Sequence, residues 1–170
     1  MLAKAVAVAF VLLFPLIFGP ADAEDEIFGI WRDPAMQADV FLYACDDGLC
    51  GDLVRLPEKA ARQDLKNPDP AKRGRNLLGL TVIDGFHRID RSGSMWIGGG
   101  DQGRLPGRIY VPTNGDTLGD AANTYVISLT SKDTLTIGID NCLFSCLASY
   151  KWFRVGGDDR PRTSRQSGRN

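Results

Sequence analysis

The sequence predicts an all-β protein, an eight-stranded antiparallel up-and-down meander barrel built from a single domain. Short runs that alternate apolar and polar residues occur along the 170-residue chain, and such runs bury one face of a strand and leave the other in water. Turn residues separate the runs, and no stretch of a dozen residues shows the 3.6-residue period of an amphipathic helix. With 44% hydrophobic residues, the chain can bury a core. Closure into a barrel removes exposed edge strands, whereas a two-sheet sandwich fits the same pattern and stays open as the alternative.

Residues 1–23 are expected to be a cleaved secretory signal peptide. Lys4 is followed by an apolar run of 14 residues, which matches a signal-peptide core of roughly 7–15 residues and is shorter than the about 20 residues of a membrane-spanning helix. The Ala-Asp-Ala motif at 21–23 then supplies the small-x-small pattern of a cleavage site. A short membrane anchor is the alternative, which Pro15 and the short length disfavour. We therefore expect a periplasmic or secreted protein without an integral membrane segment after cleavage.

The eight strands are assigned in chain order from the alternation. It is clearest late in the chain, where Tyr125, Ile127 and Leu129 share one face of a single strand. The fifth strand is expected to be interrupted, because a glycine run breaks it and residues 101–107 bulge out before it resumes. The expected strands are 27–32, 38–45, 50–56, 77–84, 95–111, 123–130, 134–140 and 147–155.

Two long polar connections separate these strands. In the first, at 57–76, Pro68 and Pro70 cannot donate to a hydrogen-bond ladder, which excludes a central strand, and one helical turn is expected at 60–64. The second is a Gly/Asp/Asn loop at 112–122. Successive connections of a meander alternate between the two barrel ends. Both loops should therefore share one rim with the turn between strands seven and eight, and the long loops make this rim the expected functional surface.

The barrel domain is expected to span 24–155, followed by a disordered tail at 156–170 that carries four arginines and no large apolar residue. The chain has 20 Lys and Arg against 21 Asp and Glu, a formal net charge of -1. This balance argues against a basic face for nucleic acid. We expect a monomer that binds no nucleic acid.

The four cysteines are Cys45, Cys50, Cys142 and Cys146. They allow three disulfide pairings or a zinc site, and export to an oxidising compartment favours disulfides. Cys45 and Cys50 flank an expected four-residue hairpin loop and should face each other as its closing pair, while Cys142 and Cys146 flank a three-residue turn. The two hairpins lie at opposite barrel ends, so we predict the pairs Cys45–Cys50 and Cys142–Cys146.

Short motifs along the chain form an ordered series: Gly29-Ile30-Trp31, Leu49-Cys50-Gly51, Asp64-Leu65-Lys66-Asn67-Pro68-Asp69-Pro70, Trp96-Ile97-Gly98-Gly99, Gly107-Arg108-Ile109-Tyr110 and Trp152-Phe153-Arg154. In this order they resemble the bacterial domain-of-unknown-function family 2147, over about residues 28–155. The resemblance implies an exported, lipocalin-like meander barrel, and it implies no enzymatic activity because the family is uncharacterised. The chain departs from the family pattern in an insertion at 101–107, a longer loop at 113–123 and the additional Cys146.

Catalytic residues are not indicated. His87 is the only histidine and is expected in an exposed loop, and the chain has no Gly-x-Ser-x-Gly or similar nucleophile motif. We therefore expect no enzymatic activity, and no cofactor.

The rim candidates are Asp64, Asn67 and Asp69, which place oxygen atoms close together in the first long loop. Their spacing does not match a calcium-binding loop, so turn chemistry is the favoured interpretation and no metal is expected. They remain the best candidates for a ligand- or partner-binding rim.

Several aromatic side chains are expected inside the barrel, where they either fill a packed core or line a ligand cavity. Of these two interpretations, a packed core is slightly favoured. These residues are Trp31, Trp96, Tyr125, Tyr150 and Trp152, with Phe41 and Tyr43 as further candidates.

Two functions from different classes follow. The first is a non-enzymatic binding module that holds a small apolar or amphipathic ligand in the barrel mouth. The alternative is a module that binds an envelope protein or inhibits a protease through the loops at one barrel end.

Overall fold

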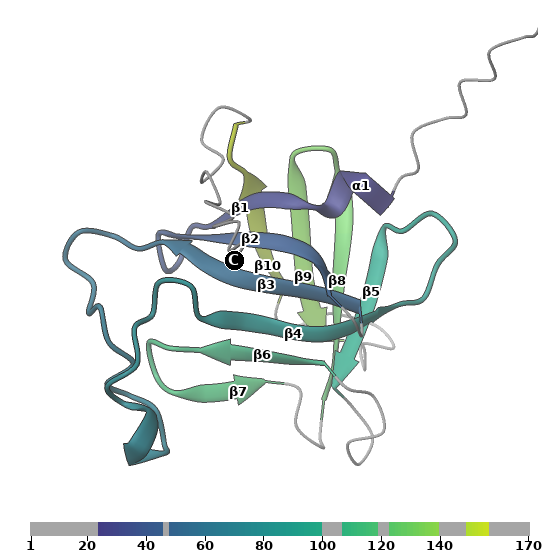
Figure 1. Cartoon of the computed structure of the whole chain (residues 1–170). Helices are drawn as coiled ribbons and strands as arrows, with labels where there is room; N and C mark the ends of the chain where they lie inside the picture. Colours follow the sequence, from purple (N-terminus) through teal and green to yellow (C-terminus); the bar gives the residue numbers. More distant parts are fainter. Residues whose placement is uncertain (1–23, 46–47, 100–106, 119–122, 140–148, 157–170) are drawn as a thin grey trace, which may run out of the picture.

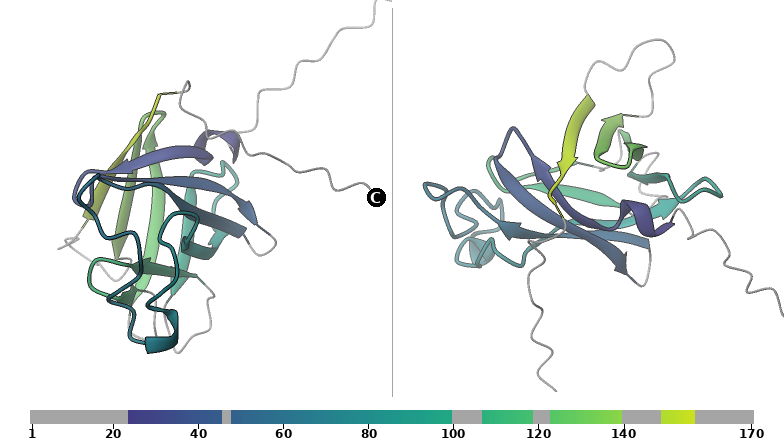
Figure 2. Two further views of the ribbon diagram at one scale, coloured as in Figure 1. Left: turned by 60° about the vertical axis from the view of Figure 1, so that its left-hand side comes forward. Right: turned by 90° about the horizontal axis from the view of Figure 1, so that it is seen from above.

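The computed structural model describes residues 24–45, 48–99, 107–118, 123–139 and 149–156. In these residues, one antiparallel sheet curls into a barrel with almost no helix (Figures 1 and 2). The elements are α1 (Glu24–Ile27), β1 (Gly29–Asp33), β2 (Ala38–Cys45), β3 (Gly48–Arg55), the 3-10 turn η1 (Pro70–Lys72), β4 (Thr81–Arg88), β5 (Met95–Gly99), β6 (Arg108–Val111), β7 (Asp116–Leu118), β8 (Thr124–Ser131), β9 (Thr134–Ile139) and β10 (Ser149–Arg154).

The barrel closes through two pairings that a sandwich would lack. β1 pairs with β10, and β3 pairs with both β2 and β4. The order around the barrel is therefore β1-β2-β3-β4-β5-β8-β9-β10, which confirms the predicted eight-stranded meander. Residues 1–23, which are expected to be a signal peptide, lie outside the described residues, as do residues 157–170, Cys142 and Cys146, so the expectations for them stay predictions.

The interrupted fifth strand is confirmed. β5 and β6 both pair with β4, through Arg88↔Trp96 and Asp84↔Arg108. These two pairs are four residues apart on β4 and twelve apart along the chain from Trp96 to Arg108, so the chain between them has eight residues more than the β4 ladder accommodates. The described ends of this segment meet at two glycines, since a Cβ on Gly107 would lie 2.5 Å from the Cα of Gly98.

Four local expectations are wrong. Ile27 belongs to α1 rather than to the first strand. β4 runs from Thr81 to Arg88 instead of over 77–84, which places His87 in a strand opposite Ile97 instead of in a loop. The helical turn of the first long loop is η1 rather than 60–64; Asp69 caps it by accepting a hydrogen bond from the backbone N–H of Ala71. The second long loop contains β7, which pairs with β6 as a hairpin.

The hairpin between β2 and β3 carries the predicted disulfide with a corrected register. Cys45 and Cys50 are bonded, with their Cα atoms 5.8 Å apart. Cys45 pairs with Gly48, however, and Cys50 pairs with Tyr43, because β3 begins two residues earlier than expected. Gly48 has a φ of 139°, and a Cβ there would lie 2.0 Å from the carbonyl oxygen of Phe86, so this position requires glycine.

One end of the barrel is filled by side chains. Trp31 and Ile27 are fully buried, and the indole N–H of Trp31 donates a 2.8 Å hydrogen bond to the Ile27 carbonyl. The guanidinium of Arg154 lies over the Trp31 ring, 4.2 Å from its centroid, and donates to the backbone carbonyls of Phe28 (3.1 Å) and Lys132 (2.6 Å). This contact ties the last strand to the first and to the β8–β9 turn, and it seals the end that α1 covers.

Candidate functional site

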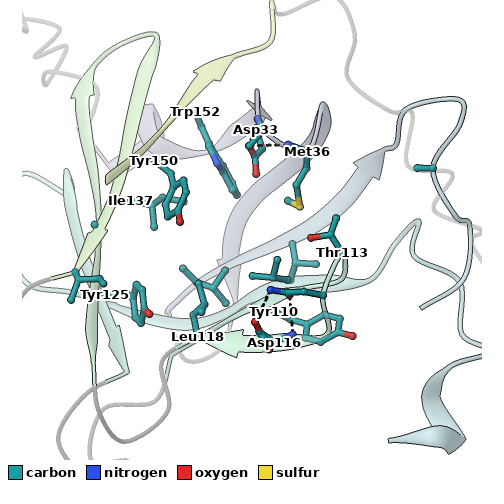
Figure 3. A pocket seen from close by; sticks show the side chains of 18 of the residues that line it. Asp33, Met36, Tyr110, Thr113, Asp116, Leu118, Tyr125, Ile137, Tyr150 and Trp152 are labelled. Carbon is teal, nitrogen blue, oxygen red and sulfur yellow. Dashed lines mark hydrogen bonds between the residues drawn. The ribbon is translucent and has the colours of Figure 1, made fainter. Parts of the chain in front are cut away.

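The opposite end of the barrel is hollow. A cavity of about 770 Å³ lies between the barrel wall, the β1–β2 turn, the start of the 57–76 loop and the β6–β7 hairpin (Figure 3). Its walls are mainly apolar, and they include Met36, Val82, Ile109, Leu118, Ile137 and Ile139. Both interpretations of the barrel interior therefore apply: side chains fill one end, and the other end holds a cavity.

The predicted interior aromatics divide between the two ends. Trp152, Tyr125 and Tyr150 line the cavity, whereas Trp31 and Trp96 do not and are buried elsewhere in the core. Tyr150 faces the cavity but is 56% exposed, because it lies near the start of β10 at the mouth.

The further candidates Phe41 and Tyr43 were placed wrongly. They stack on each other with ring centroids 5.8 Å apart, and the Tyr43 hydroxyl donates to Asp52 at 3.1 Å. Both are only half-buried, while the alternate residues Val40 and Leu42 are fully buried. Phe41 and Tyr43 therefore lie on the outer face of β2.

A cavity residue that the sequence analysis missed is Asp33, the last residue of β1. It is 8% exposed, and its Oδ1 accepts hydrogen bonds from the backbone N–H groups of Ala35 (2.8 Å) and Met36 (3.3 Å). Its Oδ2 accepts none from any residue that the structure describes. Figure 3 shows Asp33 beside Trp152 on the cavity wall. The available signal was its position two residues after Trp31, because residues i and i+2 of a strand share a face.

The rim candidate Asp64 is fully buried, and three partners surround its carboxylate. The Tyr110 hydroxyl donates at 2.5 Å, the Asn67 amide at 2.8 Å and the Arg75 guanidinium at 2.8 Å. Burial would raise the pKa of the Asp64 carboxyl, but the hydrogen bonds from Tyr110, Asn67 and Arg75 outweigh burial and hold the pKa below its usual value. Burial and the bond to Asp64 raise the pKa of Tyr110.

The other two rim candidates support the same loop. Asn67 is 4% exposed, and its side-chain oxygen accepts from the backbone N–H of Asp69 at 2.9 Å, while Asp69 caps η1. The turn between β6 and β7 also packs on this loop, since a Cβ on Gly115 would lie 2.0 Å from the Lys66 carbonyl oxygen. The two long loops thus meet at one rim, as the meander predicts. The structure gives Asp64 and Asn67 internal partners, and a ligand-binding role for the three candidates stays a prediction.

A smaller cavity of about 220 Å³ lies under the 57–76 loop. It shares Met36, Pro57, Ala60 and Thr113 with the large cavity, so the two are adjacent. Its other walls include Leu53, Leu56 and Leu77. The 57–76 loop and the β6–β7 hairpin therefore shape both apolar spaces; Figure 2 shows this loop on the side of the barrel away from α1.

The part of the chain that the structure describes contains no candidate metal-binding cluster. No group of three or more His, Cys, Asp or Glu residues there is placed to hold a metal ion. No helix in the same part is long and apolar enough to cross a membrane.

Comparisons with known proteins agree with this architecture. The model of the family described as uncharacterized protein conserved in bacteria (DUF2147) matches residues 29–154. A solved structure of a protein from Helicobacter pylori, described as belonging to the lipocalin family, superimposes with a TM-score of 0.57 at 15% sequence identity. The match covers 75% of this chain and 82% of that protein, and at this identity it shows the shared fold alone. No curated protein matches the sequence.

Proposed function

Because the chain belongs to the DUF2147 family of uncharacterized bacterial proteins and has a lipocalin-like barrel, we propose that it is a non-enzymatic binding module. Its ligand is a small apolar or amphipathic molecule that enters the open end of the barrel. The observation that carries the proposal is the cavity of about 770 Å³. Ligand pockets commonly measure roughly 300–1,000 Å³ and combine apolar walls with a few polar groups.

The composition of the cavity wall supports an amphipathic ligand. Ile137, Val82 and Leu118 supply apolar surface, while Asp33 and Asn114 supply polar atoms. Each buried methylene group of a ligand contributes about 0.8 kcal/mol through the hydrophobic effect. A chain of eight to twelve carbons therefore contributes about 6–10 kcal/mol, which lies within the range of about 4–15 kcal/mol for the cost of association.

The compartment of this module is part of the proposal. The disulfide between Cys45 and Cys50 supports an extracytoplasmic location, because such bonds persist mainly in oxidising compartments. We propose that the protein is exported through the N-terminal signal at 1–23 and acts in the periplasm or outside the cell.

Binding of a neutral apolar dye tests the proposal. Wild-type protein should bind the dye with a stoichiometry of one and release it when a decyl amphiphile is added. Ile139→Trp, which fills the cavity wall, should weaken dye binding at least tenfold. Thr136→Trp on the same strand is the matched control, because it lies outside the cavity lining. Equal dye binding by both variants would rule out the cavity as the site.

A second candidate function is a partner-binding module that uses the 57–76 loop. Leu65, which also lines the smaller cavity, is 58% exposed and Leu78 just after the loop is 40% exposed, so apolar surface is available outside the large cavity. Recovery of an envelope protein by the wild type but not by Leu65→Ser would support it. Recovery that is insensitive to this change would remove it.

A further inference from the structure

The described residues that line the large cavity include charged side chains, and all of them are acidic. Asp33 and Asp116 contribute carboxylates, while no Lys, Arg or His occurs among the described residues that line it. Among the described residues, an anionic ligand would therefore meet like charges and no compensating cation. The described lining disfavours anions such as fatty carboxylates.

Asp33 has a carboxylate oxygen that is free to accept a hydrogen bond from a ligand in the cavity. Its two backbone hydrogen bonds both fall on Oδ1, which is enough to hold the β1–β2 turn. Oδ2 accepts no hydrogen bond from the described residues, and Asp33 as a whole is 8% exposed. No fully buried side-chain oxygen among the described residues lacks a partner, so Oδ2 opens onto the cavity, where a donor from a ligand or solvent can reach it.

The surroundings of Asp33 suit a positive charge. Trp152 and Tyr150 line the same cavity, with Trp152 beside Asp33 in Figure 3. Aromatic faces attract ammonium groups, and this attraction grows where water is excluded. Asp116, by contrast, is exposed at the rim and accepts a 2.5 Å hydrogen bond from Asn114, so it adds long-range attraction rather than a contact.

We propose that the ligand is a cationic amphiphile, with an amine or quaternary ammonium head group held at Asp33 and an apolar tail in the barrel. This inference rests on the proposed function and specifies its ligand. The head group lies between Oδ2 of Asp33 and the ring of Trp152. The tail extends along Val82, Ile109 and Ile137.

The test compares amphiphiles that share one tail. Isothermal titration with decyltrimethylammonium, decyl maltoside and decyl sulfate, each below its critical micelle concentration, separates the charge from the apolar contribution. Wild-type protein should bind the cation at least tenfold more tightly than the neutral maltoside, and the sulfate most weakly.

Asp33→Asn isolates the charge of Asp33. An asparagine keeps the side-chain oxygen that accepts from Ala35 and Met36, so the turn is retained while the charge is lost. The variant should bind decyltrimethylammonium at least tenfold more weakly and decyl maltoside unchanged. Asp84→Asn is the matched control, because Asp84 is 58% exposed and lies outside the cavity lining.

The outcomes are distinguishable. If the maltoside binds as tightly as the cation and Asp33→Asn changes neither, the cationic ligand is refuted while the binding module stands. If none of the three amphiphiles binds, the proposed function fails together with this inference.

Discussion

The hydroxyl of Tyr110 on β6 donates a 2.5 Å hydrogen bond to Asp64, which lies 46 positions earlier in the 57–76 loop. The Arg75 guanidinium completes the contact from 5.3 Å above the Tyr110 ring and at 2.8 Å from the carboxylate. This cluster fastens the loop to the β6–β7 hairpin, and both segments border the cavities. Through it, the loop keeps the shape of the open end.

Tyr110→Phe removes one hydrogen bond to a buried carboxylate. We expect the free energy of unfolding to fall by about 1.5–3 kcal/mol, the range for hydrogen bonds to charged groups. Urea unfolding measures it. Tyr43→Phe is the matched control: the Tyr43 hydroxyl bonds Asp52 on the half-exposed outer face, so its loss should cost under about 1 kcal/mol. Equal losses in the two variants would contradict a special role for the loop contact.

Acid should destabilise the barrel through its buried carboxylates. Burial would raise the pKa of Asp39, but hydrogen bonds from Arg32 and Arg55 outweigh it, so the pKa of Asp39 lies below its usual value, as does that of Asp64. The stabilisation is present in full above the unfolded pKa of about 3.9 and is lost as pH falls through the folded pKa. Urea unfolding between pH 6 and pH 2 should show this fall. Asp39→Asn should flatten it, and an unchanged profile would refute the assignment.

Arg154→Lys tests the seal of the closed end. Lysine keeps the charge but cannot lie flat on Trp31 while donating to several carbonyls, as Arg154 does. We expect a loss of about 2–3 kcal/mol in urea unfolding, by analogy with hydrogen-bonded charged groups. Arg108→Lys is the control, because Arg108 is 67% exposed and its ion pair with Asp84 is long, at 3.8 Å, so it contributes little. Amphiphile binding should survive Arg154→Lys, since the cavity is at the other end.

Removal of the first disulfide should have a modest effect. Cys45 and Cys50 are five positions apart, and closing so short a loop contributes about 2 kcal/mol through the entropy of the unfolded chain. A Cys45→Ala, Cys50→Ala double variant should therefore remain folded with a lowered Tm. Non-reducing peptide mapping of the wild type checks the Cys142–Cys146 prediction at the same time. A Cys45–Cys142 or Cys50–Cys146 peptide would overturn both pairs.

The barrel could be predicted because period-two alternation reports which face of a strand is buried. The limits 38–45 agree with β2, and the end of β5 at Gly99 follows from the glycine run, which weakens a strand there. β7 could not be predicted in this way. Its sequence Asp116–Leu118 has the polar composition of a loop, and its strand conformation depends on pairing with β6.

The site was less predictable than the fold, because a cavity depends on where large side chains lie along the barrel axis. Trp31 and Trp96 fill the core away from the cavity, while Trp152 borders it, and alternation assigns all three equally to the interior. Asp33 was missed because the expected first strand ended at Arg32. Asp64 was recognised as a candidate, but its burial depends on Tyr110, which is distant in sequence.

The central claim is that a ligand occupies the open end of the barrel, and methyl NMR locates it directly. In protein labelled at isoleucine δ1 methyl groups, titration with decyl maltoside should give saturable shifts at Ile109, Ile137 and Ile139, which line the cavity. Ile27 at the closed end and the exposed Ile89 should not shift. Shifts that never saturate, or that spare the three cavity isoleucines, would contradict the account.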